Sequence, residues 1–303
     1  MTPSLAIYGN FTIDDLVFPD GSTRWAVPGG NAPYAALGAS LWTRAVSIVA
    51  PIGADYPIES LGDSIDLSHC RRLPHTMRNW GLYEEDGTRH FVSRRASSNW
   101  KNFSPQVADV ASGYQAAHIA PMPHEAAIQV IQALREAGTT LISLDLDDHD
   151  LLGDTSLDKT IELLRGIDLF MPSRQDALAL FPDATPLEAL RRLRLVAPEV
   201  TLIAIKCGAD GAIAHLANAK NWLHIPAVPV EVFDTTGAGD AFCGGVLAGF
   251  ARQDNPVEAL LYGAISASFC IEGLGFSGLA AATEAAAHNL LVALRPRIDI
   301  QPI

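Results

Sequence analysis

The chain has 303 residues, of which 49% are hydrophobic, and its formal net charge at pH 7 is −13. A chain of this length can bury a large core as one α/β domain, with or without a small appendage. The acidic balance, without any long run of Lys or Arg, argues against nucleic acid or a membrane surface as the main partner. A small-molecule partner is the better expectation.

The N-terminus and the cysteines indicate the compartment. Residues 1–10 lack the basic and apolar regions of a signal peptide, and no apolar run in the sequence is long enough to span a bilayer. The four cysteines are scattered without CxxC pairing, which is typical of reduced thiols in apolar surroundings. We therefore expect a cytoplasmic protein.

Two predicted hairpins follow a first short strand at residues 4–8. One hairpin covers residues 11–27 with a turn at 19–22, and the other covers 78–93 with an Asp-Gly turn. Together the two hairpins could form a small sheet. Because neighbouring residues of a strand point to opposite faces, at most one of Asp14 and Asp15 should face a given cleft.

Between these hairpins, a glycine pair precedes a helix of small residues. Gly29 and Gly30 are followed by Asn31, and taken alone such a Gly-Gly-Asn sequence is more often a plain turn. Residues 45–52 are typical of a second core strand.

From residue 116 onward, apolar strands alternate with helices. This alternation predicts a mainly parallel sheet covered on both faces, with ligands at the carboxyl ends of its strands. Two further helices are predicted at 257–269 and 279–294. The predicted strands are 116–120, 140–145, 169–171 and 201–206, and the helices between and after them are 124–137, 157–165, 175–180 and 187–195.

The acidic residues after the strand at 140–145 have two interpretations. Asp145, Asp147, Asp148 and Asp150, with His149 among them, have a spacing that could hold a hard cation. The glycine that a calcium loop requires is missing, however, and an acidic loop at a strand end is usually solvated. We favour the solvated loop and keep the metal site as the alternative.

The most informative stretch begins with an extended apolar run at 225–233. The run leads to residues 234–240 (Asp-Thr-Thr-Gly-Ala-Gly-Asp), which we call the signature loop, and a buried helix of small residues follows. Gly237 and Gly239 let a ligand approach the main chain closely, and a helix N-terminus attracts an anion. Asp240 could accept the proton of a hydroxyl that attacks a bound phosphate, which predicts phosphoryl transfer to an alcohol. The alternative is that Asp240 only caps the helix.

The signature loop and the two residues after it, Ala241 and Phe242, resemble the C-terminal signature of the PfkB (ribokinase-like) carbohydrate kinases. The Gly29-Gly30 pair and the small residues after it resemble the N-terminal signature of the same family. The resemblance implies a ribokinase-like α/β fold, with a central, mainly parallel sheet flanked by helices in a single domain over 1–303. A small β-sheet lid would be formed by about 11–28 and 78–98.

The resemblance also implies roles for particular residues. Asp240 would be the catalytic base, beside an anion hole formed by the amides of Gly237, Ala238 and Gly239. The sugar would be held by Asp14, which accepts hydrogen bonds from its hydroxyls, and by Gly29, Gly30 and Asn31.

ATP and Mg2+ are implied in the same way. Relatives commonly have Asn-x-x-Glu where this chain has Ser173 and Asp176, so the nucleotide contact would fall to a hydroxyl and the water-mediated Mg2+ contact to a shorter carboxylate. Asp234 would help to hold a monovalent cation such as K+. The other nucleotide-binding residues implied by the resemblance are Lys206, Gly208, Gly211, Thr235, Gly237 and Gly239.

These observations predict an ATP-dependent kinase that phosphorylates a hydroxyl of a sugar or a sugar-like alcohol, with a homodimer through the lid as a further implication of the resemblance. A nucleoside kinase of the same family and a non-catalytic relative that kept the scaffold are the alternatives. A dinucleotide-dependent oxidoreductase is disfavoured, because no glycine fingerprint follows the first strand. The acceptor itself cannot be identified from the sequence.

Overall fold

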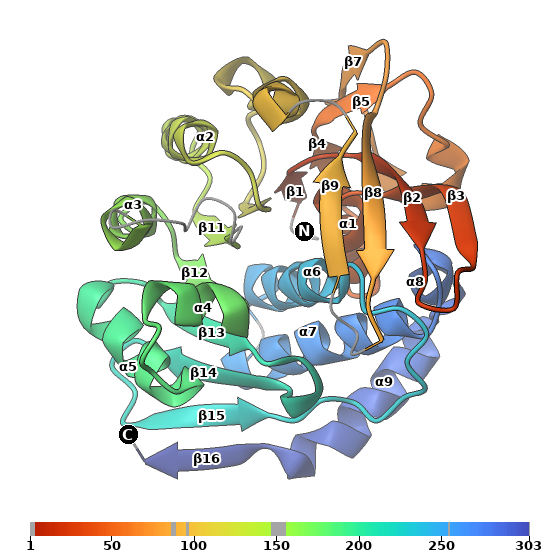
Figure 1. The fold of residues 1–303 in the computed structure, drawn as a ribbon. Helices are drawn as coiled ribbons and strands as arrows, with labels where there is room; N and C mark the ends of the chain where they lie inside the picture. Colours follow the sequence, from red (N-terminus) through yellow and green to blue (C-terminus); the bar gives the residue numbers. More distant parts are fainter. Residues whose placement is uncertain (1–3, 86–88, 95–96, 147–155, 254, 303) are drawn as a thin grey trace.

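The computed structural model describes residues 4–85, 89–94, 97–146, 156–253 and 255–302. A large sheet with helices on both faces and a separate smaller sheet at one end make up the fold (Figure 1). Two hydrophobic clusters form the core: Leu5 and Ile7 of the first strand belong to one, and Ala6 and Tyr8 belong to the other. The predicted mainly parallel α/β architecture is therefore confirmed.

The large sheet has the strand order β16-β15-β14-β13-β12-β11-β10-β1-β4-β6. Neighbouring strands from β6 to β13 pair in parallel, and β14, β15 and β16 continue the sheet in antiparallel pairing. The strands are β1 (Leu5–Tyr8), β4 (Val46–Val49), β6 (Ile65–Asp66), β10 (Ala116–Ile119), β11 (Leu141–Leu144), β12 (Leu169–Phe170), β13 (Leu202–Lys206), β14 (Ala212–Leu216), β15 (Asn221–Ile225) and β16 (Asp299–Pro302).

Helices cover both faces of this sheet, as Figure 1 shows. One cluster includes α1 (Asn31–Ser40), α6 (Ala238–Ala251), α7 (Pro256–Ile271), α8 (Ser277–Ala281) and α9 (Glu284–Leu294). The other includes α2 (His124–Glu136), α3 (Ser156–Leu164), α4 (Arg174–Leu180) and α5 (Pro186–Val196). A two-stranded sheet of β5 (Pro51–Gly53) and β7 (Arg71–Leu73) and five short 3-10 segments (Ile58–Leu61, Ser97–Phe103, Val107–Asp109, Gly208–Asp210 and Arg295–Arg297) complete the described elements.

Helix α6 is built from small residues because it lies closely between α1 and α7. A Cβ atom on Gly244 would lie 1.9 Å from the carbonyl oxygen of Ala35 in α1, and one on Gly249 would lie 2.6 Å from the Cα of Ala259 in α7. Larger side chains would therefore force the helices apart. This packing fixes the position of the α6 N-terminus, where the signature loop ends.

We call the four-stranded sheet the small sheet; its order is β3-β2-β8-β9. Its strands are β2 (Thr12–Val17), β3 (Thr23–Gly29), β8 (Met77–Tyr83) and β9 (Arg89–Ser93). Both predicted hairpins are confirmed by antiparallel pairing, and β2 and β8 join them in parallel. The role of a lid for residues 11–28 and 78–98 stays a prediction, and the predicted Asp-Gly turn at 86–87 lies outside the described residues.

Three sequence-based expectations need comment. The run at 225–233 was expected to be extended up to the signature loop, but the sheet strand ends at Ile225, because Pro226 and Pro229 have no N–H to continue a ladder. The helix predicted at 279–294 is two helices, separated by Thr283, which caps the second by accepting a hydrogen bond from Ala286 N at 3.2 Å. The acidic residues 147–150 lie outside the described residues.

Within the described part of the chain, the helices are too short or too polar to serve as membrane spans.

Candidate active site

The signature loop reaches the N-terminus of α6 through a residue that must be glycine. Gly237 has a φ of 78°, and a Cβ atom there would lie 2.3 Å from the ring of Tyr34 on α1. The first-turn amides of a helix have no acceptor inside it, so this end of α6 is suited to an anion. The Ala238 amide donates a long bond to the Thr235 carbonyl at 3.3 Å. The anion hole at the amides of Gly237, Ala238 and Gly239 stays a prediction.

Asp240 lies in the first turn of α6 and is partly exposed. One turn later, Cys243 is fully buried, and burial raises the pKa of its thiol well above the usual value. The Cys243 thiol is therefore not available as a base near neutral pH. The catalytic role of Asp240 stays a prediction at this point.

A buried lysine stands beside the signature loop. Lys206, the last residue of β13, forms an ion pair with Asp145, which follows β11. Its Nζ atom lies 3.5 Å from Cys243 Sγ and 3.3 Å from the position that a Cβ atom on Gly239 would occupy. Burial alone would lower the pKa of Lys206, but the Asp145 carboxylate outweighs it and raises the pKa above its usual value. A permanent positive charge therefore adjoins the loop.

A solvated loop was the interpretation favoured for the acidic run that begins at Asp145, but Asp145 itself is buried. Its carboxyl is buried, because the end of β11 points toward Lys206 and α6. Burial raises the pKa of Asp145, and the neighbouring Lys206 opposes this effect. No cluster of three or more His, Cys, Asp or Glu residues suited to a metal ion occurs in the ranges that the structure covers.

Ser173 and Asp176 form a capping box at the start of α4. Ser173 Oγ accepts a hydrogen bond from Asp176 N at 3.1 Å, and Ser173 N donates to Asp176 Oδ2 at 2.7 Å. Burial and the nearby Asp145 carboxylate raise the pKa of Asp176 to about 7. Both side chains thus have a structural task, and their contacts with the nucleotide and Mg2+ stay predictions.

The glycine turn after β13 lies next to this cap. Gly208 and Gly211 have φ angles of 61° and 79°, and they flank a 3-10 turn that joins the antiparallel strands β13 and β14. Arg174 of α4 bonds to Asp210 in the turn and to the carbonyl of Cys207 at 2.8 Å. Four predicted nucleotide-binding residues therefore lie together at the carboxyl ends of β12 and β13: Ser173, Lys206, Gly208 and Gly211.

On the small sheet, Asp14 and Asp15 point to opposite faces, as predicted. Asp14 Oδ2 accepts from Thr12 Oγ1 at 2.9 Å, and Asp14 Oδ1 accepts from Asn79 Nδ2 at 3.0 Å. Asp15 instead accepts from the Ala26 amide at 2.9 Å and pairs with Arg94. Burial, the largest influence, raises the pKa of Asp14 to about 6.

The glycine pair and Asn31 adjoin Asp14. A Cβ atom on Gly29 would lie 2.4 Å from Asp14 Oδ2, and Gly30, with a φ of 114°, precedes α1. The side-chain amide of Asn31 accepts from Asn10 N at 2.8 Å and donates to the Pro121 carbonyl at 2.7 Å. It therefore ties the chain after β1 to the chain after β10, a scaffold contact that the sequence did not indicate.

Asp234 meets the small sheet through Tyr83, the last residue of β8. The Tyr83 hydroxyl lies 3.1 and 3.3 Å from the two carboxylate oxygens of Asp234 and 2.7 Å from Thr236 Oγ1. Thr236 N also donates to Asp234 Oδ1 at 2.9 Å. Sequence reasoning missed Tyr83 and Asn79, although their alternate spacing on β8 could have placed both on the face that bears Asp14.

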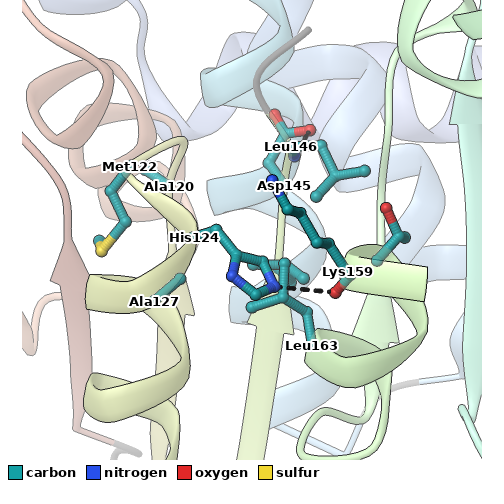
Figure 2. Close-up of a pocket in the computed structure, with 10 residues that line it drawn as sticks. Ala120, Met122, His124, Ala127, Asp145, Leu146, Lys159 and Leu163 are labelled. Carbon is teal, nitrogen blue, oxygen red and sulfur yellow. Dashed lines mark hydrogen bonds between the residues drawn. The ribbon is translucent and has the colours of Figure 1, made fainter. Parts of the chain in front are cut away.

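Figure 2 shows a small cavity beside Asp145, between α2 and α3. His124 Nε2 lies 3.0 Å from the Lys159 carbonyl at its rim. The cavity holds about 30 Å3, which suits a single water molecule and is too small for a sugar. The candidate acceptor site is therefore sought elsewhere, where Tyr83 brings the small sheet against the signature loop.

Comparisons with known proteins agree with this geometry. The family profile described as "pfkB family carbohydrate kinase" matches residues 4–280. A cytidine kinase of Thermococcus kodakarensis is 28% identical over 258 residues, which cover 84% of this chain and 90% of that protein.

Two solved structures have the same fold. Ribokinase of Arabidopsis thaliana, complexed with ribose and ATP, is 20% identical with a TM-score of 0.73, and the match covers 96% of this chain and 99% of the other. Fructokinase of Vibrio cholerae O395, bound to fructose, ADP and calcium ion, is 18% identical with a TM-score of 0.76, covering 96% and 100%. At these identities the likeness establishes the ribokinase-like fold, which confirms the expected fold class.

Proposed function

The chain belongs to the pfkB family of carbohydrate kinases, and on this premise we propose that it transfers the γ-phosphoryl group of ATP to a hydroxyl of a sugar or a sugar-like alcohol. One observation carries the proposal. Asp240 lies in the first turn of α6, the Lys206 ammonium adjoins Gly239 in the same loop, and Tyr83 joins this loop to the sheet that bears Asp14. On this proposal, a phosphate site and a hydroxyl site lie on the two sides of the Tyr83 contact.

The phosphate half of the site combines a fixed charge with backbone amides. Lys206 and the first turn of α6 would stabilise the negative charge of the transferred group. Ser173, Thr235 and the Gly208–Gly211 turn would border the nucleotide. Mg2+ would arrive bound to the ATP phosphates and to several waters, and Asp176 would contact it through one of these waters.

Asp240 would act as the base. It accepts the proton of the acceptor hydroxyl while the hydroxyl oxygen bonds to the γ-phosphorus and the bond from that phosphorus to the ADP oxygen breaks. The products are a phosphorylated alcohol and ADP. The partial exposure of Asp240 supports this role, because an acceptor can reach the carboxylate.

Asp14 would bind the acceptor, with Gly29, Gly30 and Asn31 shaping the floor beneath it. Each carboxylate oxygen already accepts one hydrogen bond, from Thr12 or Asn79, and an ionised carboxylate can accept further bonds from hydroxyls. The small sheet would then act as a lid that keeps water from competing with the acceptor.

The outer face of the small sheet supports a homodimer. Trp25, Leu82 and Val92 are 61%, 40% and 52% exposed, and exposed apolar side chains of this size often mark a protein contact. A monovalent cation such as K+ would bind at Asp234, whose carboxylate belongs to the signature loop.

A nucleoside kinase is the second candidate. The 28% identity with a cytidine kinase over 84% of the chain favours it. On the face of the small sheet that bears Asp14, Gly81 lies beside the buried Leu16 and the partly exposed ring of Phe91, near the carboxylate proposed to bind the acceptor. A base attached to a ribose could lie against such a ring.

The test is ATP consumption with Mg2+, coupled to ADP detection, against a panel of pentoses, hexoses, ketohexoses, sugar acids and nucleosides. We expect turnover with one class and a loss of several powers of ten in Asp240→Asn, with acceptor binding retained. Turnover near the wild-type level in Asp240→Asn would refute the assignment of the base. No ADP release with any member of the panel, while ATP binding is intact, would favour a non-catalytic relative.

A further inference from the structure

Tyr83 connects two parts of the proposed site that are far apart in the sequence. It is separated from Asp234 by 151 residues, yet its hydroxyl reaches both carboxylate oxygens of Asp234 and the hydroxyl of Thr236. The ring of Phe18, at the tip of the other hairpin, packs against the Tyr83 ring with centroids 4.9 Å apart. Both hairpins of the small sheet therefore take part in this contact.

The same strand also serves the acceptor side. Asn79 and Tyr83 lie four residues apart on β8 and so on one face, about 13 Å from each other along the strand. Asn79 holds Asp14, whereas Tyr83 holds the signature loop. A displacement of β8 would change both contacts together, because the strand moves as a unit.

The contact matters for the loop because Asp234 is 5% exposed. A buried carboxylate needs hydrogen-bond donors, and the two observed ones are the Thr236 amide within the loop and the Tyr83 hydroxyl from the small sheet. Withdrawal of the small sheet would remove the second donor and open Asp234 to water. The loop would then lose the contacts that the Tyr83 hydroxyl makes with Asp234 and Thr236.

We propose that Tyr83 is a positioning residue that fastens the small sheet to the signature loop and thereby couples acceptor enclosure to the assembly of the phosphate site. This inference rests on the proposed kinase function. With the sheet docked, the acceptor is covered and the loop is held for phosphoryl transfer. With the sheet displaced, the loop is held less firmly, which disfavours loss of the phosphoryl group to water.

The decisive variant is Tyr83→Phe, which keeps the ring against Phe18 and removes only the hydroxyl. We expect the KM for the acceptor to rise about tenfold, equivalent to about 1.4 kcal/mol, because a smaller fraction of molecules has the small sheet docked. The dissociation constant for ATP in the absence of acceptor should stay within about twofold.

The matched control is Tyr8→Phe. Tyr8 is buried, and its hydroxyl accepts a long bond from the Ala111 amide at 3.5 Å, on the other side of the large sheet from α6. Its KM for the acceptor should equal that of the wild type. A double-mutant cycle of Tyr83→Phe with Thr236→Val should show non-additive effects if the two hydroxyls interact directly.

A readout that needs no catalysis separates this inference from the proposed function. Hydrogen exchange of the β8 amides should be about tenfold faster in Tyr83→Phe than in the wild type, whether or not an acceptor is known. If the wild type transfers no phosphoryl group to any acceptor, the kinase proposal fails while the exchange result still tests the contact. Unchanged β8 exchange in Tyr83→Phe, or an equal rise of KM in Tyr8→Phe, would overturn the role of Tyr83.

Discussion

Gly239→Ala tests whether a phosphate binds at the signature loop. The backbone of Gly239 is helical and does not need a left-handed conformation, so alanine can adopt it. The new Cβ atom would lie 3.3 Å from Lys206 Nζ, 3.6 Å from Cε and 3.7 Å from Cδ. These atoms form the far end of a flexible side chain, which can shift by a few tenths of an ångström.

The expected changes in stability and activity therefore differ. Alanine is a better helix former than glycine by up to about 1 kcal/mol, so the melting temperature should stay equal or rise slightly. The methyl group, however, would occupy the space between Lys206 and the first turn of α6, where the transferred phosphoryl group is proposed to bind. A displacement of about 1 Å costs on the order of 100-fold in rate, equivalent to about 2.7 kcal/mol.

The assay is kcat/KM for MgATP by coupled ADP release, with a thermal melt of the same sample. Gly237→Ala is the contrasting variant, because its Cβ atom would lie 2.3 Å from the Tyr34 ring at a φ of 78°, so its melting temperature should fall. A Gly239→Ala enzyme with unchanged kcat/KM and an unchanged melting temperature would refute the placement of the phosphate at this loop.

Three further predictions concern the buried charges and the outer face. Burial raises the pKa of Asp14 from 3.8 to about 6, so the native state binds this proton more tightly than the unfolded state. The stability contributed by this group therefore falls as pH rises from about 4 to 6. Asp14→Asn should accordingly melt higher than the wild type at pH 8, and in the wild type the acceptor KM should rise as pH falls below about 6. Lys206→Met should lose about 3–5 kcal/mol in urea unfolding, because it leaves Asp145 buried without its partner, and should weaken ATP binding. Trp25→Glu should convert a dimer into a monomer in sedimentation velocity, because it places a charge on the exposed apolar face.

Each of these predictions has a control. Equal melting temperatures of Asp14→Asn and the wild type at pH 8 would contradict the buried, raised-pKa carboxyl. The double variant Lys206→Met with Asp145→Asn should regain stability without regaining ATP affinity, and recovery of both would assign Lys206 a purely structural role. A wild type that sediments as a monomer at high concentration would contradict the dimer.

Local features could be read directly from the residues. The glycines of the signature loop and Asp240 are neighbours in the chain. The sequence therefore placed them together at a helix N-terminus, as the structure has them. The alternation of strands and helices was equally accessible, since periodicity in the chain becomes layering in the fold. The opposite orientations of Asp14 and Asp15 followed from the strand period alone.

Local patterns failed where a neighbour in space outweighed them. Residues 226–233 are apolar as a core strand would be, yet two prolines prevent the ladder. Asp145 begins an acidic run for which a solvated loop was the favoured interpretation. Its side chain is buried instead, because it pairs with Lys206, the last residue of β13. The contacts of the Asn31 amide with the backbone of Asn10 and Pro121 could not be read from its neighbours in the chain, and its contact with an acceptor stays a prediction.

The sequence by itself thus determined the family, the layered fold and the loop that carries the proposed base, because these depend on residues that are close in the chain or on a repeated period. Only the tertiary structure decided which side chains support that loop. Asp145 and Lys206 are 61 residues apart, Asp14 and Asn79 are 65 apart, and Tyr83 and Asp234 are 151 apart. Such pairs form when the packing of α6 and the small sheet brings distant strand ends together. Hydrophobic periodicity along the chain does not predict which strand ends will be neighbours.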